Sequence, residues 1–118
     1  MKRVLIAEDE YITALWIKNV IKELGHEVVA LVDTGEMAVK QALELRPDIS
    51  FLDINMEQRN SGIDACRSIK KLCPSIKIYF LSAYPGNAFS EELAGIQYDG
   101  YIDKMDFADN VGRLLDSD

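Results

Sequence analysis

The stretch Ile49-Ser50-Phe51-Leu52-Asp53 decides the fold, because it is a short apolar run that ends abruptly in an acid. Its length and composition are typical of a strand buried on both faces of a parallel sheet. Three further runs of the same kind also end in polar residues, which indicates several such strands. These runs, with the polar residues that end or follow them, are Arg3–Ala7 with Glu8 and Asp9, 76–81 with Ser82, and 100–103 with Lys104.

Helix-like segments separate the strand-like runs along the whole chain. A fifth run covers residues 27–32, and apolar residues at helical spacing predict helices over 10–24, 34–45, 62–72, 87–94 and from 106 onward. This alternation predicts an α/β domain with a five-stranded parallel sheet in the flavodoxin-like order 2-1-3-4-5 and helices on both faces. We expect residues 1–118 to form a single domain, because no linker or repeat interrupts the pattern.

Composition excludes several classes of function. The net charge is −7, which argues against direct nucleic-acid binding. No apolar run approaches the length of a membrane span, and the apolar run before Glu8 is too short for a signal peptide, so we expect a cytoplasmic protein. With two cysteines, no CxxC motif and His26 as the single histidine, a zinc site is not expected. Lys70 and Lys71 are expected to lie on a solvated helix face.

The polar residues at the strand ends form a candidate site. Ligands of open parallel sheets bind beyond the carboxyl ends of the strands, so Glu8, Asp9, Asp53, Ser82 and Lys104 are predicted to share one edge. Three neighbouring carboxylates do not all stay ionised without a cation. Oxygen ligands favour a hard divalent metal ion, and such an ion points to phosphate chemistry.

Each of these residues also has a purely structural interpretation when it is taken alone. Glu8 and Asp9 could cap the helix that follows them, because acids are favoured at helix N-termini. Asp53 could be a turn residue, and serine and lysine are common at strand ends. The functional interpretation therefore depends on their joint placement.

The ordered set of residues resembles the receiver domain of two-component response regulators. The resemblance rests on the acid pair Glu8-Asp9, the segment Asp53-Ile54-Asn55-Met56, the pair Ser82-Ala83, and Tyr101 placed three residues before Lys104. It covers essentially the whole chain and implies phosphoryl transfer to Asp53 from a histidine kinase or phosphotransfer protein.

The resemblance also implies roles for the neighbouring residues. Mg²⁺ would be held by Asp9, Asp53, the backbone carbonyl of Asn55 and, through water, Glu8. Lys104 and Ser82 would contact the phosphoryl oxygens. The implied switch pair is Ser82 and Tyr101, and the implied rate-tuning positions are Asn55 and Tyr84.

The implied output acts through protein partners rather than through nucleic acid or membrane. The fourth helix, fifth strand and fifth helix would bind a downstream effector domain or protein, and a phosphorylation-dependent homodimer is compatible with the family. Such a domain catalyses its own phosphorylation and slow dephosphorylation, but it is not a conventional turnover enzyme.

The chain departs from the family pattern at two places. Glu57 stands where many members have proline, and Gly62 comes one residue late, so the loop 56–61 is longer and more polar. Met105 follows Lys104 where the family usually has proline in a cis peptide. A cis bond before a non-proline residue costs roughly 2.5–4 kcal/mol, so we expect a trans bond with a shifted lysine, or else a strained cis bond.

Two alternative functions compete with this interpretation. One is a degenerate receiver that works as a phosphorylation-independent protein-binding module. The other is a haloacid-dehalogenase-like phosphatase, but Asn55 stands where such enzymes have a second acid. The sequence leaves open whether the domain stands alone or belongs to a longer protein.

Overall fold

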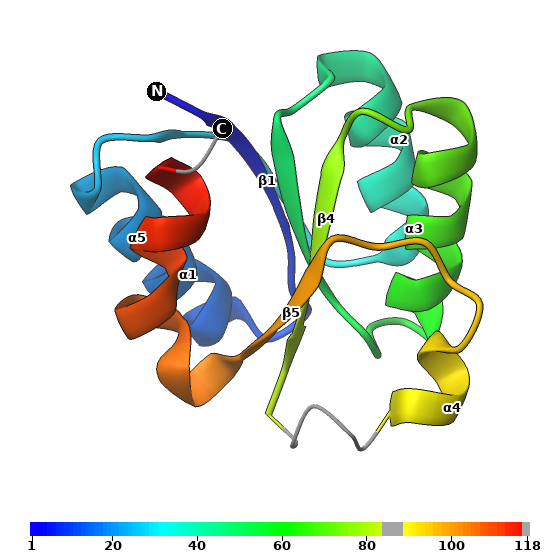
Figure 1. Cartoon of the computed structure of the whole chain (residues 1–118). Helices are drawn as coiled ribbons and strands as arrows, with labels where there is room; N and C mark the ends of the chain where they lie inside the picture. Colours follow the sequence, from blue (N-terminus) through cyan, green and yellow to red (C-terminus); the bar gives the residue numbers. More distant parts are fainter. Residues whose placement is uncertain (84–88, 117–118) are drawn as a thin grey trace.

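The computed structural model describes residues 1–83 and 89–116, and it is a three-layer α/β sandwich (Figure 1). Its elements are β1 (Arg3–Ala7), α1 (Tyr11–Glu23), β2 (Glu27–Val32), α2 (Gly35–Leu45), β3 (Ile49–Asp53), α3 (Ser61–Leu72), β4 (Lys77–Ser82), α4 (Ser90–Leu93), β5 (Gly100–Asp103), the 3₁₀ turn η2 (Lys104–Asp106) and α5 (Phe107–Asp116).

The sheet has the predicted topology. All neighbouring strands are parallel, and their order is β2-β1-β3-β4-β5. Helices α1 and α5 cover one face, and α2, α3 and α4 lie on the other side (Figure 1). The flavodoxin-like arrangement predicted from the alternation of strands and helices is therefore confirmed.

Each face of the sheet has its own apolar core, because alternate strand residues point to opposite sides. Leu52 and Phe80 pack under α2 and α3, whereas Phe51 packs under α1 and α5. On the second face, the ring centroid of Phe107 lies 5.4 Å from that of Phe51 and 5.9 Å from that of Trp16. These contacts fix the start of α5 against the sheet.

The helix expected over residues 87–94 differs most from the sequence-based prediction. In the described part of the chain, α4 is a single turn of four residues, Ser90–Leu93, and residues 87 and 88 lie outside that part. The apolar stripe of this segment is poor, with Leu93 as its buried residue. A short helix with little apolar surface to bury gains little stability from packing.

Lys70 is buried, which corrects the expectation of a solvated face. Its residue exposure is 8 %, and its Nζ lies 2.7 Å from Oδ2 of Asp99. The same carboxylate oxygen accepts the backbone N–H of Ile78 at 2.7 Å. The ion pair therefore ties α3 to the segment that leads into β5.

No helix within residues 1–83 and 89–116 is long and apolar enough to cross a membrane.

Candidate functional site

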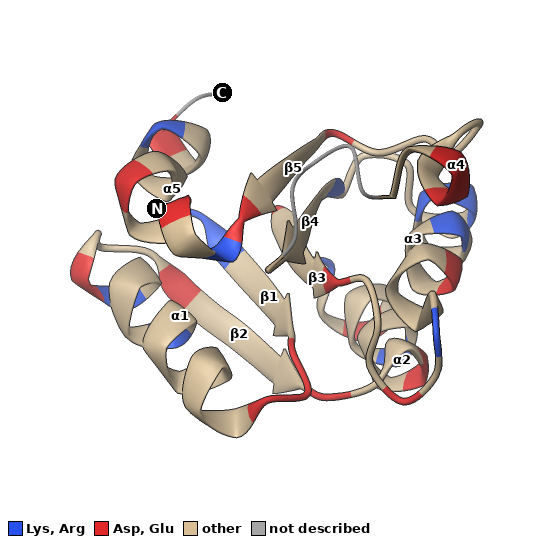
Figure 2. Cartoon of the chain, turned by 90° about the horizontal axis from the view of Figure 1, so that it is seen from below, with Lys and Arg blue, Asp and Glu red and all other residues tan. Residues whose placement is uncertain are grey.

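Strand register brings the predicted site residues to one edge of the sheet. Asp53 pairs with Leu81, which directly precedes Ser82, and Ser82 pairs with Asp103, which directly precedes Lys104. On the other side of β3, Leu52 pairs with Ala7, the last residue before the acid pair. Because the carboxyl ends of neighbouring parallel strands lie at the same edge of the sheet, residues from four strands meet there. Acidic segments follow β1 and β3 at this edge (Figure 2).

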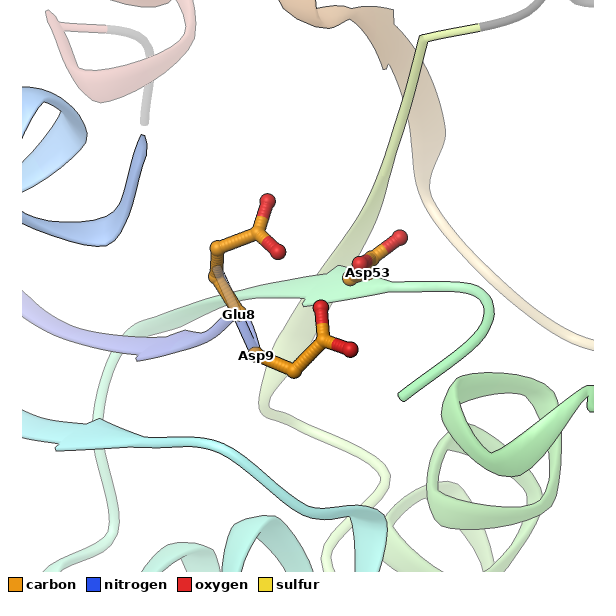
Figure 3. A group of neighbouring side chains, drawn as sticks. All are labelled: Glu8, Asp9 and Asp53. Carbon is orange, nitrogen blue, oxygen red and sulfur yellow. The ribbon is translucent and has the colours of Figure 1, made fainter. Parts of the chain in front are cut away.

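Three carboxylates form the centre of the site. Ligand oxygens of Glu8, Asp9 and Asp53 all lie within 4.8 Å of one another, and Figure 3 shows the three side chains grouped together. The Glu8 side chain is fully buried and that of Asp53 is 13 % exposed, whereas Asp9 faces solvent. The cluster is therefore open on the Asp9 side.

Lys104 reaches this cluster although methionine follows it. Its Nζ lies 2.5 Å from Oε1 of Glu8 and 3.5 Å from Oδ2 of Asp53. There is no cis peptide in the described residues, so of the two alternatives for the Lys104–Met105 bond the structure has the trans one. The side chain of Asp103 accepts the Met105 N–H at 2.9 Å and thereby stabilises the turn that directs the lysine inward.

The proximity of the acids changes their protonation. Burial, followed by the charge of Glu8, raises the pKa of Asp53 to about 7, although Lys104 opposes this shift. Burial and Glu8 also raise the pKa of Asp9. For Glu8, burial acts to raise the pKa, but hydrogen bonds from Lys104 and from the backbone of Glu10 lower it overall. Without a cation, Asp53 is therefore partly protonated at neutral pH.

The donor set fits a divalent cation such as Mg²⁺. The cluster consists of carboxylate oxygens, which are the ligands that Mg²⁺ prefers, and it carries more negative charge than Lys104 alone neutralises. Burial by itself lowers the pKa of Lys104, but the hydrogen bond to Glu8 and the charge of Asp53 raise this pKa overall. Lys104 therefore stays cationic. Glu8, Asp9 and Asp53 could hold the ion.

The predicted switch residues are in contact. Ser82 is 3 % exposed, and its side chain is hydrogen-bonded to that of Tyr101. Burial raises the pKa of the Tyr101 phenol, and the bond to Ser82 partly offsets this effect. Tyr84, predicted to tune the dephosphorylation rate, lies outside the described residues.

The loop after Asp53 is held by its own side chains. Oδ1 of Asn55 accepts the Asn60 N–H at 2.6 Å, and Oγ of Ser61 accepts the Met56 N–H at 2.9 Å. The Asn55 side chain is thus engaged within the loop. The loop can close only on glycine, because a Cβ on Gly62 would lie 1.8 Å from the carbonyl oxygen of Asp53.

Glu57 has a contact that sequence reasoning missed. Its Oε1 accepts the Gly35 N–H at 2.8 Å and its Oε2 accepts the Glu36 N–H at 3.3 Å, so the carboxylate caps the start of α2. Burial by itself raises the pKa of Glu57, but these backbone donors lower that pKa overall. In the sequence, Glu57 stands out only because it replaces the usual proline. This difference does not point to the N–H groups of Gly35 and Glu36, about twenty residues earlier in the chain.

Comparison with known proteins gives the family. Residues 4–112 match the model of the response regulator receiver domain, and the chain belongs to that family. Receiver domains generally bind Mg²⁺ and interact with kinases and effector domains. The resemblance inferred from the ordered residues is therefore confirmed.

Individual relatives agree with this assignment. The chain is 42 % identical to the chemotaxis protein CheY of Thermotoga maritima over 82 residues, which are 70 % of this chain and 68 % of CheY. It is 30 % identical to the response regulator GacA of Pseudomonas viridiflava over 105 residues, which are 88 % of this chain but 49 % of GacA. The receiver domain of a modulated diguanylate cyclase from Desulfovibrio desulfuricans G20 superimposes with a TM-score of 0.86 at 28 % identity, covering 98 % of this chain and 90 % of that one.

Proposed function

We propose that this chain is a phosphorylation-dependent signalling receiver that accepts a phosphoryl group on Asp53 from a histidine kinase or phosphotransfer protein. The observation that carries the proposal is the position of Asp53. It ends a central strand, shares a cluster within 4.8 Å with Glu8 and Asp9, and has Lys104 Nζ 3.5 Å from its Oδ2. Few structural roles require three acids and a lysine at one strand edge.

Asp53 would act as the nucleophile. A P–O bond forms between its carboxylate oxygen and phosphorus while the P–N bond to the donor histidine breaks, and the electron pair of that bond remains on the histidine nitrogen. The carboxylate must be ionised to attack, so the proton favoured by burial and by Glu8 has to leave first. A Mg²⁺ ion bound at the acid cluster would supply charge neutralisation for the transferring phosphoryl group.

The other site residues would position the phosphoryl group. The Lys104 ammonium would pair with one phosphoryl oxygen, which requires it to exchange its contact with Glu8 for the new anion. Ser82 lies on the neighbouring strand end and would donate a hydrogen bond to a second oxygen. The Asn55 carbonyl, two residues beyond Asp53, would complete the ligands of the ion. Asn55 and Tyr84 remain the proposed tuners of a slow dephosphorylation.

The signal would leave through Ser82 and Tyr101. Because these side chains are hydrogen-bonded, recruitment of Ser82 to a phosphoryl oxygen would break or redirect that bond and change the position of Tyr101. Tyr101 also lines a groove with Ile102 and Leu114 between β5 and α5. We propose that α4, β5 and α5 together form the face that binds a downstream effector or a second copy of the domain.

The test is the intact mass of the chain after incubation with acetyl phosphate and Mg²⁺. One phosphoryl adduct is expected on the wild type and on Asp64→Asn, an exposed acid on α3. The adduct should be absent from Asp53→Asn and from the sample without metal. Absence of an adduct on the wild type, also with a phosphorylated kinase as donor, would favour the phosphorylation-independent binding module instead.

A further inference from the structure

Glu57 joins the loop that follows Asp53 to a different part of the fold. Both of its carboxylate oxygens accept backbone N–H groups at the start of α2, one from Gly35 at 2.8 Å and one from Glu36 at 3.3 Å. We propose that Glu57 is a positioning residue, which holds the loop 54–60 against α2 and so fixes the loop backbone beside the acid cluster for a divalent cation. This inference rests on the proposed function, because it concerns the ion that the function requires.

The Glu57 contact differs in kind from the other hydrogen bonds of the loop. Those bonds are local: Asn60 N–H to Asn55, Met56 N–H to Ser61, and Gly62 N–H to the carbonyl oxygen of Ile54 at 2.8 Å. They tie the loop to itself and to the first residues of α3. Within residues 1–83 and 89–116, the side-chain hydrogen bonds that join this loop to another region of the sequence are the two made by Glu57.

The start of α2 is a firm anchor. A Cβ on Gly35 would lie 2.6 Å from the carbonyl oxygen of Ser61, so the first turns of α2 and α3 approach each other backbone to backbone. Oγ1 of Thr34 caps the same helix end by accepting the Met37 N–H at 3.0 Å. The helix dipole adds attraction for a carboxylate at this end. Figure 2 shows the loop after β3 lying beside α2.

A fixed loop would favour metal binding. Mg²⁺ demands a near-ideal octahedron of oxygen ligands, and the three carboxylates do not fill it. The loop leaves the cluster at Asp53, and Glu57 acts only four residues further along the chain. If the contact were absent, the loop would have to be ordered when the ion binds, and that loss of conformational entropy would weaken affinity.

The experiment compares Mg²⁺ affinity by calorimetry in the full chain for Glu57→Ala, Glu57→Gln and Thr34→Ala. Thr34→Ala is the matched control, because it removes a cap from the same helix end without touching the loop. We expect Glu57→Ala to weaken Mg²⁺ binding roughly tenfold. Glu57→Gln keeps one acceptor oxygen, so its Mg²⁺ affinity should lie between those of Glu57→Ala and the wild type. The Mg²⁺ affinity of Thr34→Ala should stay within about twofold of the wild-type value.

A second readout separates positioning from loss of stability. The Mg²⁺ concentration that gives half-maximal labelling of Asp53 by acetyl phosphate should rise in Glu57→Ala by the same factor as the dissociation constant. Both Glu57→Ala and Thr34→Ala should lower the melting temperature, since each removes a cap of α2.

Three results would overturn the inference. Wild-type affinity in Glu57→Ala would show that the contact does not position the loop. Equal weakening by Thr34→Ala would show that any loss of α2 capping has the same effect. Failure of the wild type to bind Mg²⁺ would overturn the proposed function together with this inference, whereas the first two results would leave the proposed function standing.

Discussion

Replacing Asp53 by asparagine is expected to stabilise the metal-free protein at alkaline pH. In the fold, burial and the charge of Glu8 raise the pKa of Asp53 from 3.8 to about 7. The folded state therefore holds this proton more tightly than the unfolded chain does. Ionisation of Asp53 costs stability progressively as pH rises from about 4 to about 7, and the full penalty is present above that range. Asparagine carries no charge and avoids the penalty.

The magnitude follows from the two pKa values. A change from 3.8 to about 7, at about 1.4 kcal/mol per pH unit, corresponds to a penalty of about 4 kcal/mol. The acid cluster titrates as a group, and Asp9 is open to solvent, so part of this penalty is shared and screened. We therefore expect Asp53→Asn to raise the free energy of unfolding by roughly 1–3 kcal/mol at pH 8.

The assay is urea unfolding at pH 4 and at pH 8 in the presence of a chelator. The stability difference between wild type and Asp53→Asn should be small at pH 4 and reach its full size at pH 8. Asp64→Asn is the control, because this acid lies on the surface of α3 in an exposed pair with Arg67. Its effect should stay within about 0.5 kcal/mol at both pH values.

Mg²⁺ gives the complementary result. At pH 8 the ion should stabilise the wild type by about 1.4 kcal/mol when its concentration is tenfold above the dissociation constant. Asp53→Asn should gain much less, because it lacks one ligand carboxylate. The reasoning is refuted if Asp53→Asn is less stable than the wild type at pH 8 without metal, or if the difference between them does not change with pH.

Four further predictions concern the scaffold. Lys70→Met should destabilise the fold by about 1–3 kcal/mol in urea unfolding, because it removes the charge partner of Asp99 and leaves that partly exposed carboxylate with the Ile78 N–H alone. Lys71→Met on the exposed side of α3 should change stability by less than about 0.5 kcal/mol. Gly62→Ala should lower the melting temperature sharply, since its Cβ would meet a carbonyl oxygen at 1.8 Å. Gly112→Ala, whose Cβ would have no contact closer than 3.9 Å, should stabilise α5 by about 0.5–1 kcal/mol. Burial raises the pKa of the Cys66 thiol to about 11, so mass spectrometry should show slow alkylation at pH 8 in the native state and fast alkylation in urea.

The grouping of the candidate site could be predicted without a structure, because parallel strands end at a common edge. Apolar runs that end in Asp53 or Ser82 mark strand ends directly, and the side-chain types indicate the chemistry. Met105 in place of proline left the reach of Lys104 open in the sequence, and the structure brings its Nζ to Glu8 and Asp53. Asp103 stabilises a trans turn that brings the lysine to the acids.

Two contacts could not be predicted in this way. Glu57 caps a helix that begins 22 residues earlier in the chain. Lys70 is paired with Asp99, beyond α4. Neither lies at a position where local periodicity or a turn signal specifies a partner. In sequence both look like ordinary solvated charges.

The amino-acid sequence by itself determined the layers, the strand order and the edge at which the acids, the hydroxyl and the amine gather. These features follow from local rules, namely strand and helix periodicity, handed crossovers and strand ends that coincide. Only the tertiary structure decided how deeply each charge is buried and which distant group neutralises it. Burial and Coulomb interactions depend on distances between segments remote in the chain, and those distances set both the raised pKa of Asp53 and the capping role of Glu57.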